Sequence, residues 1–85
     1  MITVTVKLIG DHKRKSATFS VNLNKEQSLG DLLKSLNLEI FKEDGGLRPD
    51  MVVIINGKNA HFLNGLNTKL KHGDVIVIMP IVVGG

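Results

Sequence analysis

The sequence contains no cysteine, which removes several functional classes at once. A disulfide scaffold, a thiolate nucleophile, a cysteine-ligated zinc site and an iron–sulfur cluster all need this residue. Tryptophan and tyrosine are also absent, so we expect an aliphatic core with Phe19, Phe41 and Phe62 as its large anchors. No apolar run approaches the roughly 18 residues that a membrane-spanning helix requires. We therefore expect no membrane partner.

The length of 85 residues is enough for one domain with a single modest core. Residues 1–6 alternate like a strand and lack the basic start and apolar run of a signal peptide. We expect a single-domain, cytoplasmic protein.

The net charge is +3, and the excess is concentrated in Lys13, Arg14 and Lys15, beside His12. A nucleic-acid surface usually combines such residues with exposed aromatic side chains or a recognition element. This basic segment has no aromatic residue and lies between two predicted strands. A solvated hairpin turn is the preferred interpretation, and we expect no nucleic-acid partner.

The first half of the chain changes its hydrophobic period once. Apolar and polar residues alternate over residues 2–8 and again over 17–23, which is typical of strands with one buried face. The short polar segment between them favours a hairpin. Ser28 then precedes leucines at helical spacing, with Asp31 in the place of the Glu or Gln of a capping box. This pattern predicts a helix over about residues 28–37 whose leucine stripe packs on the sheet.

The second half of the chain predicts three more strands. Residues 51–55 are all apolar and are followed by Asn56-Gly57, a strong tight-turn signal. Residues 58–62 predict a short return strand, and residues 63–71 look irregular, with room for one helical turn. Residues 75–79 predict the last strand, which we expect Pro80 to end because proline cannot donate to a ladder.

The order of elements therefore indicates an α+β fold. Its compact solution is a mixed sheet of about five strands with one main helix packed across one face. A last strand that pairs in parallel with the first gives a ubiquitin-like β-grasp. We expect a β-grasp domain over residues 1–80 and an extended tail over 81–85.

The strands at 51–55 and 75–79 are apolar at nearly every position, which usually indicates burial on both faces. One short helix can cover only one face, so one parity of these residues should form an exposed patch of the kind that binds partners. Shielding of these strands by loops is the alternative explanation. We predict that the partner-docking patch comprises Val52, Ile54, Ile76, Ile78 and Pro80. The alternating residues of opposite parity in the same two strands are the alternative set, and the sequence does not decide between the two.

The tail from Ile81 to Gly85 leaves directly from this patch. Val82 and Val83 are β-branched and favour extended backbone. Gly84 and Gly85 lack a Cβ and can pass where another group comes very close. Terminal glycines can also be mere fraying residues. In this setting, however, the tail has the shape needed to thread a narrow channel.

The sequence shows no catalytic or metal-binding constellation. The three histidines lie in separate turn or edge segments without acidic neighbours at ligand spacing. Gly45-Gly46 and Gly84-Gly85 do not match a phosphate-binding loop, which needs Gly-Lys-Ser/Thr at the start of a helix. We therefore expect a protein that is not an enzyme and binds no metal or cofactor of its own.

Several motifs follow one another in the second half of the chain. They are Asn56-Gly57 after an apolar strand, the segment of residues 70–75, Pro80, and the terminal Gly84-Gly85. Together they resemble the MoaD/ThiS family of ubiquitin-like sulfur carriers, over essentially the whole chain and most specifically over residues 70–85. The length and the proline before the tail are more similar to MoaD, the small subunit of molybdopterin synthase. Members of that type often carry two prolines in the tail, whereas this chain has only Pro80 there, and its positive net charge is also atypical.

The resemblance implies sulfur donation in molybdopterin (molybdenum cofactor) biosynthesis. An adenylating, MoeB-like enzyme would use ATP and Mg²⁺ to activate the carboxylate of Gly85, and sulfur transfer would give a thiocarboxylate. The tail would then enter a large, MoaE-like synthase subunit. On this view Gly84 allows close approach, residues 81–83 position the tail, and the apolar patch docks both partners.

Two alternatives remain open from the sequence. A ubiquitin-like modifier would share the activation step but form an isopeptide bond between Gly85 and a target lysine. A passive β-grasp interaction module would carry the same tail without using it.

Overall fold

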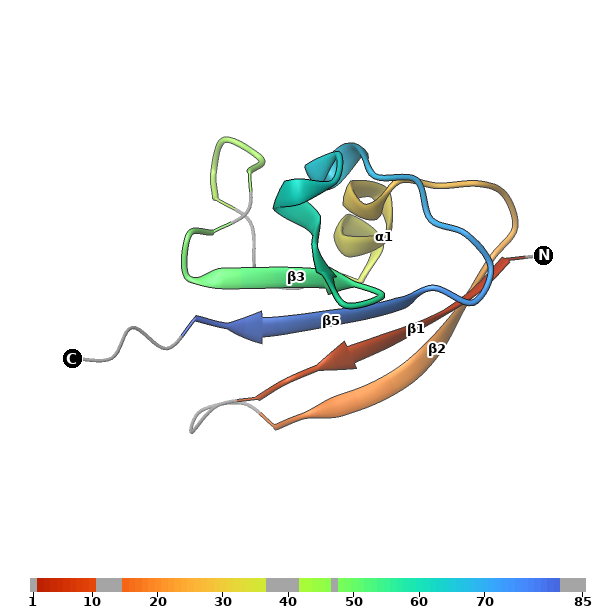
Figure 1. Cartoon of the computed structure of the whole chain (residues 1–85), viewed down its shortest axis with the longest axis horizontal. Coiled ribbons are helices and arrows are strands. Elements are labelled where there is room, and N and C mark those ends of the chain that lie inside the picture. The colour runs from red at the N-terminus through yellow and green to blue at the C-terminus, as the bar shows by residue number, and fades with distance from the viewer. Residues whose placement is uncertain (1, 11–14, 37–41, 47, 82–85) are drawn as a thin grey trace.

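The computed structural model describes residues 2–10, 15–36, 42–46 and 48–81 (Figure 1). Its five strands form one sheet in the order β2-β1-β5-β3-β4. The central β1–β5 pair is parallel and the other pairs are antiparallel. This is the mixed sheet that was predicted. In chain order the elements are β1 (Ile2–Leu8), β2 (Ala17–Leu23), α1 (Leu29–Ser35), β3 (Met51–Ile55), β4 (Lys58–Asn59), the 3₁₀ turns η1 (Ala60–Phe62) and η2 (Gly65–Asn67), and β5 (Val75–Pro80).

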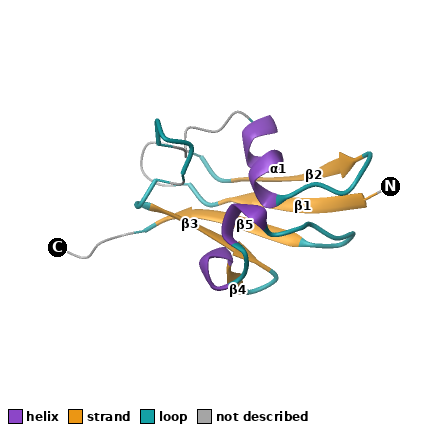
Figure 2. Cartoon of the chain, turned by 90° about the horizontal axis from the view of Figure 1, so that it is seen from above, coloured by secondary structure: helices purple, strands orange, loops and turns teal. Residues whose placement is uncertain are grey.

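The helix and both 3₁₀ turns lie on one face of the sheet, called the inner face below (Figure 2). The core forms between this layer and the sheet, because the leucines of α1 pack against the apolar side chains that the strands direct to the inner face. Among the described residues, the side chains buried to at least 98% are Val4, Val6, Leu29, Leu32, Leu33, Val53, Ala60, Leu70, Ile76 and Ile78. Helix α1 is seven residues long and no described helix is long and apolar enough to cross a membrane.

The start of α1 follows the predicted capping geometry. The Ser28 side chain accepts a hydrogen bond of 3.2 Å from the backbone N–H of Asp31, which satisfies one of the free donors of the first turn. Helical backbone ends at Ser35, two residues before the predicted end, and Leu36 caps it. The predicted residue 37 lies outside the described part of the chain.

Gly30 allows α1 to approach η2 closely. A Cβ added at Gly30 would lie 3.1 Å from the carbonyl oxygen and 3.2 Å from the Cβ of Leu66. A residue without a Cβ is therefore needed at position 30, because α1 and η2 pack in direct contact there.

Two predicted element boundaries are wrong. The return strand predicted over residues 58–62 is only Lys58–Asn59, because the backbone then turns into η1, where the Asn59 side chain accepts from the His61 N–H at 2.9 Å. Asn59 is thus the last residue of the ladder and also caps the helical turn that follows.

Pro80 pairs with Met51 inside β5 instead of ending the strand before it. Beyond it, the N–H of Ile81 donates to the carbonyl of Asp50 at 2.8 Å, so the odd-numbered residues of β5 direct their backbone groups to β3. The N–H that Pro80 lacks would point to the other side, where β1 has already ended at Leu8. The proline therefore leaves the β3–β5 ladder intact.

Candidate functional site

The register of β3 and β5 fixes which apolar residues face outward. Val53 pairs with Ile78 and Ile55 with Ile76, and these four side chains are all buried under the helix. The predicted patch was therefore wrong for Ile76 and Ile78. Its physical cause lies in β1, where the parallel register sets Val6 beside Ile76 and so draws that parity into the core. Pro80 shares the parity of Ile78 and lies opposite Met51.

The other parity forms an apolar surface on the uncovered face. Val52 pairs directly with Met79, and Ile54 with Val77, and all four side chains are only partly buried. We call Val52, Ile54, Val77 and Met79 the outer patch. Val52 and Ile54 were predicted for this surface, whereas Val77 and Met79 belonged to the parity that was left open.

Polar side chains border the outer patch on β1. The parallel register places Thr5 beside Val75 and Lys7 beside Val77 on the same sheet face. The outer face therefore changes from apolar over β3 and β5 to polar over β1 and β2. Such an apolar centre with a polar rim is typical of a surface that binds another protein.

The tail begins at the end of β5 beside β3. Ile81 is anchored by its N–H to the Asp50 carbonyl, while its side chain is 43% exposed. The Asp50 carboxylate in turn accepts a hydrogen bond of 3.1 Å from the Arg48 guanidinium. An exposed ion pair thus flanks the exit of the tail. The predicted tail residues Val82, Val83, Gly84 and Gly85 lie outside the described residues.

A shallow pocket of about 340 Å³ adjoins this exit. Its walls come from the start of β3, from the β4–η1 segment and from η2, and Ile81 closes one side. Most of the lining is apolar and includes Met51, Leu66 and Ile81. The inner side of the sheet end therefore also presents apolar surface beside Ile81.

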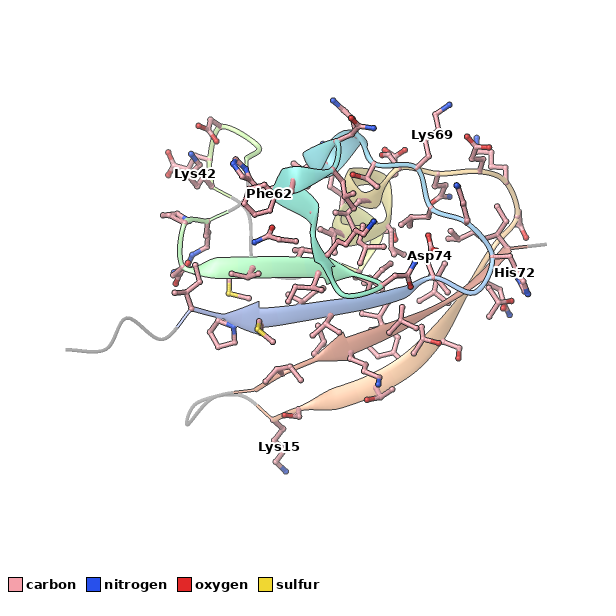
Figure 3. All side chains as sticks on the ribbon, viewed as in Figure 1. Lys15, Lys42, Phe62, Lys69, His72 and Asp74 are labelled. Carbon is pink, nitrogen blue, oxygen red and sulfur yellow. The ribbon has the colours of Figure 1, made fainter. Side chains whose placement is uncertain are left out.

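Phe62 stands beside this pocket on η1 and is 82% exposed (Figure 3). The expectation that it anchors the core was wrong, because the helical turn of η1 directs it away from the sheet. Its ring meets the His61 ring edge-on, with centroids 5.5 Å apart. Leu63 follows and is 38% exposed. No hydrophobic period marks this segment in the sequence, so only the position of η1 reveals the exposed pair.

A side-chain clamp holds β3 and β5 in register at the far end of the outer patch. The carboxylate of Asp74 accepts from the Asn56 side-chain amide at 2.9 Å and from the Lys71 N–H at 2.7 Å. The carbonyl oxygen of the Asn56 side chain accepts from the Val75 N–H at 2.9 Å. Asn56 itself has a positive φ of 51°, which the tight turn requires.

The histidines do not converge. His72 Nδ1 accepts a hydrogen bond of 3.1 Å from the Thr3 N–H, and His61 lies beside Phe62. His12 falls outside the described residues. Within the described ranges, no three His, Asp or Glu side chains gather as metal ligands would.

Relatives of the chain are named as sulfur carriers and as protein modifiers. A candidate sulfur carrier protein from Archaeoglobus fulgidus is 40% identical over 47 residues, which span 55% of this chain and 53% of that protein. The match thus spans about half the length of that relative. Small archaeal modifier protein 3 from Haloferax volcanii is 35% identical over 66 residues, or 71% of this chain and 72% of that protein.

The fold also has close counterparts among solved structures. The crystal structure of SAMP1 from Haloferax volcanii is similar with a TM-score of 0.75 and 26% identity, and the match covers 98% of this chain and 99% of that one. The β-grasp architecture is therefore confirmed. The ThiS family model matches residues 6–85. The chain belongs to the ThiS family of ubiquitin-like proteins, which includes sulfur carriers and small protein modifiers.

Proposed function

We propose that the chain is a sulfur-carrier protein that reacts through the carboxylate of Gly85. The observation that carries this proposal is the continuity of β5. One strand contributes Val77 and Met79 to the outer patch and then leads, through Ile81, directly into the glycine-ended tail. A partner bound on the patch would therefore find the tail beside it. The proposal requires Gly85 to carry a free carboxylate in the mature protein.

The reaction needs this chain and an adenylating enzyme, which the resemblance implies to be MoeB-like and which would use ATP and Mg²⁺. A carboxylate resists nucleophiles until its oxygen becomes part of a good leaving group. An oxygen of the Gly85 carboxylate attacks the α-phosphate of ATP, which releases pyrophosphate and leaves an acyl-adenylate. A sulfide equivalent from a partner then attacks the acyl carbon and displaces AMP. The product is a thiocarboxylate on Gly85.

The chain's own residues provide docking and access. The outer patch buries apolar surface against each partner, which contributes roughly 25 cal/mol for every Å² removed from water. Gly84 and Gly85 carry no side chains that would obstruct approach to the acyl carbon. Residues 81–83 supply apolar side chains that can fix the tail in a channel.

The finer assignment that we propose is molybdopterin synthesis, with the tail entering a large, MoaE-like synthase subunit. It rests on the chain length and on Pro80 before the tail, which are more similar to MoaD than to ThiS. A second candidate is conjugation to target lysines, which the 35% identity to small archaeal modifier protein 3 favours. Both candidate functions require the activated Gly85. They differ only in the nucleophile that attacks its acyl carbon, which is a sulfide equivalent in the first and a target lysine in the second.

Intact-mass spectrometry of the chain isolated from its own cells separates these candidates. A sulfur carrier should gain the mass difference between sulfur and oxygen at Gly85, and a synthase subunit should then discharge it. A modifier should instead leave a Gly-Gly remnant on target lysines after digestion. If deletion of Gly84 and Gly85 leaves both readouts unchanged, the tail is incidental and the proposal fails.

The docking role of the outer patch needs a separate variant. Val77→Glu places a charge on a partly buried outward position and should abolish thiocarboxylate formation while the chain stays folded. Asn64→Glu is the matched control, because Asn64 is exposed and precedes η2 on the opposite face of the sheet. Equal loss in both variants would contradict docking through the outer patch.

A further inference from the structure

In the described part of the chain, the free edge of the sheet at β2 has no charged residue, proline or bulge within the strand itself. β2 lies at the end of the strand order, and among the described residues it pairs only with β1 (Figure 1). Its seven residues, ATFSVNL, include no charged residue and no proline, and the pairing runs one-to-one without a bulge. Natural edge strands are commonly blocked by such devices. The opposite edge, β4, is only two residues long.

Three residues of β2 direct their backbone groups to this free edge. The Thr5 N–H donates to the Asp74 carbonyl at 2.9 Å, so the odd-numbered residues of β1 face β5. The even-numbered residues of β1 must then face β2, where they pair with Phe19 and Val21 among others. No backbone hydrogen bond of the described residues reaches the other side of β2. The residues that present an N–H and a C=O outward are therefore Thr18, Ser20 and Asn22.

The inner side of this edge is apolar. Phe19 and Val21 point toward the helix layer but are only partly buried, because they lie at the margin of the core. A strand added beside β2 would place alternate side chains next to them. Apolar side chains at those positions would bury the parts of Phe19 and Val21 that α1 leaves exposed.

Lysines flank the edge at both ends. Lys15 and Lys25 are exposed, each five residues from Ser20, and Figure 3 shows Lys15 pointing away from the sheet. Glu26 does not neutralise Lys25, because it pairs with Lys69 at 3.2 Å. Two copies of β2 paired antiparallel about Ser20 would set Lys15 opposite Lys25 at both ends, which is destabilising. Acidic residues at the ends of an added strand would be attracted instead.

We propose that the β2 edge binds an extended segment of a partner protein, with apolar residues at its centre and acidic residues at its ends, as a sixth strand of the sheet. Backbone hydrogen bonds to Thr18, Ser20 and Asn22 would give the affinity. The apolar contacts and the flanking lysines would select the sequence. This site lies at the opposite edge from the β3–β4 pair and does not depend on the tail.

A synthetic peptide of sequence Asp-Asp-Val-Ile-Val-Ile-Asp-Asp, capped at both termini, is the probe for this site. Titrated into the full ¹⁵N-labelled chain, it should shift the amide signals of Thr18, Ser20 and Asn22 in a saturable way. Added salt should weaken the binding because its ends pair with exposed lysines. The same peptide with lysines in place of its aspartates should bind at least about tenfold more weakly.

Two variants of the chain test the two halves of the proposal. Ser20→Pro removes an outward N–H that β1 does not use, so the sheet should persist and peptide affinity should fall at least about tenfold. Ser20→Val keeps that N–H and should bind as the unmodified chain does. The double variant Lys15→Glu with Lys25→Glu leaves β2 untouched and should also weaken binding, which covers the case in which the proline variant does not fold.

Three results would overturn the proposal. The first is the absence of amide shifts in β2 at millimolar peptide, and the second is a set of shifts confined to the outer patch. The third is a dimer in sedimentation experiments that Ser20→Pro dissolves, since a second copy would then be the occupant. Deleting Gly84 and Gly85 should leave peptide binding unchanged, so failure of the tail chemistry and failure of this site are distinguishable.

Discussion

The side-chain amide of Asn56 donates a hydrogen bond of 2.9 Å to the carboxylate of Asp74, across 18 positions of sequence. This contact joins the turn after β3 to the turn before β5. Asp74 is 9% exposed and is the buried charged side chain of the described residues. Because the outer patch is made by β3 and β5 alone, this pair of residues helps to hold its two halves together.

Removal of the Asp74 carboxylate should therefore destabilise the fold. Asp74→Ala leaves the Asn56 amide and the Lys71 N–H without their acceptor, which should cost about 1.5–3 kcal/mol of unfolding free energy. Urea unfolding followed by circular dichroism measures the change. Asp50→Ala is the control, because its carboxylate is 55% exposed and its pair with Arg48 contributes little. Equal stability of the two variants would contradict a structural role for the clamp.

A methyl group at Gly30 should force α1 and η2 apart. Gly30→Ala places a Cβ against the backbone of Leu66, and overpacking of this kind typically costs about 1–3 kcal/mol. Gly46→Ala provides the matched control. Its added Cβ would meet only the flexible ends of the Lys42 and Asp44 side chains at 3.3 Å. Thermal unfolding should separate the two variants, and a neutral Gly30→Ala would show that η2 moves freely relative to the helix.

Phe62 should contribute almost nothing to stability. Because its side chain is 82% exposed, Phe62→Ser should change the unfolding free energy by no more than about 0.5 kcal/mol. Leu32→Ala, at a fully buried position, should cost about 2–5 kcal/mol in the same assay. A large loss in Phe62→Ser would mean that the ring packs against the core.

The carboxyl group of Asp44 should titrate below its ordinary range. The Gly46 N–H donates to it at 2.9 Å and Lys42 lies 3.5 Å away, and both lower the pKa of Asp44 by favouring the charged form. A depressed folded-state pKa stabilises the fold above the unfolded-state pKa, and this contribution is lost as pH falls through the folded-state value. Carboxyl ¹³C shifts measure the titration. Lys42→Gln should raise the pKa only partly, because the Gly46 hydrogen bond remains.

The sequence predicted which segments form strands and helices better than it predicted which side of each strand faces the helix. Alternation identified β1 and β2 correctly, and Ser28 with its leucines identified the start of α1. In β3 and β5 every position is apolar, so periodicity carries no information on which parity faces the helix. The phase comes from β1, whose alternation is transmitted to Ile76 and Ile78 through the parallel register.

Tertiary contacts also decided what local patterns could not. The pairing of Asn56 with Asp74 depends on two turns meeting in space, although each turn is visible in the sequence. Phe62 was misplaced because Asn59 caps a helical turn where a strand was expected. The unprotected edge of β2 became visible only when the strand order was known.

The hydrogen bond from the Ile81 N–H to the Asp50 carbonyl fixes the point from which the length of the tail can be measured. Beyond this anchor the sequence has four more residues, 82–85, whose full extension spans at most about 14 Å. If Gly85 reacts as proposed while the outer patch stays docked, the reactive centre has to lie within that distance of the sheet end. The proposed function thus sets a maximum depth for the partner's active site, and one residue inserted after Ile81 would increase that depth by about 3.5 Å.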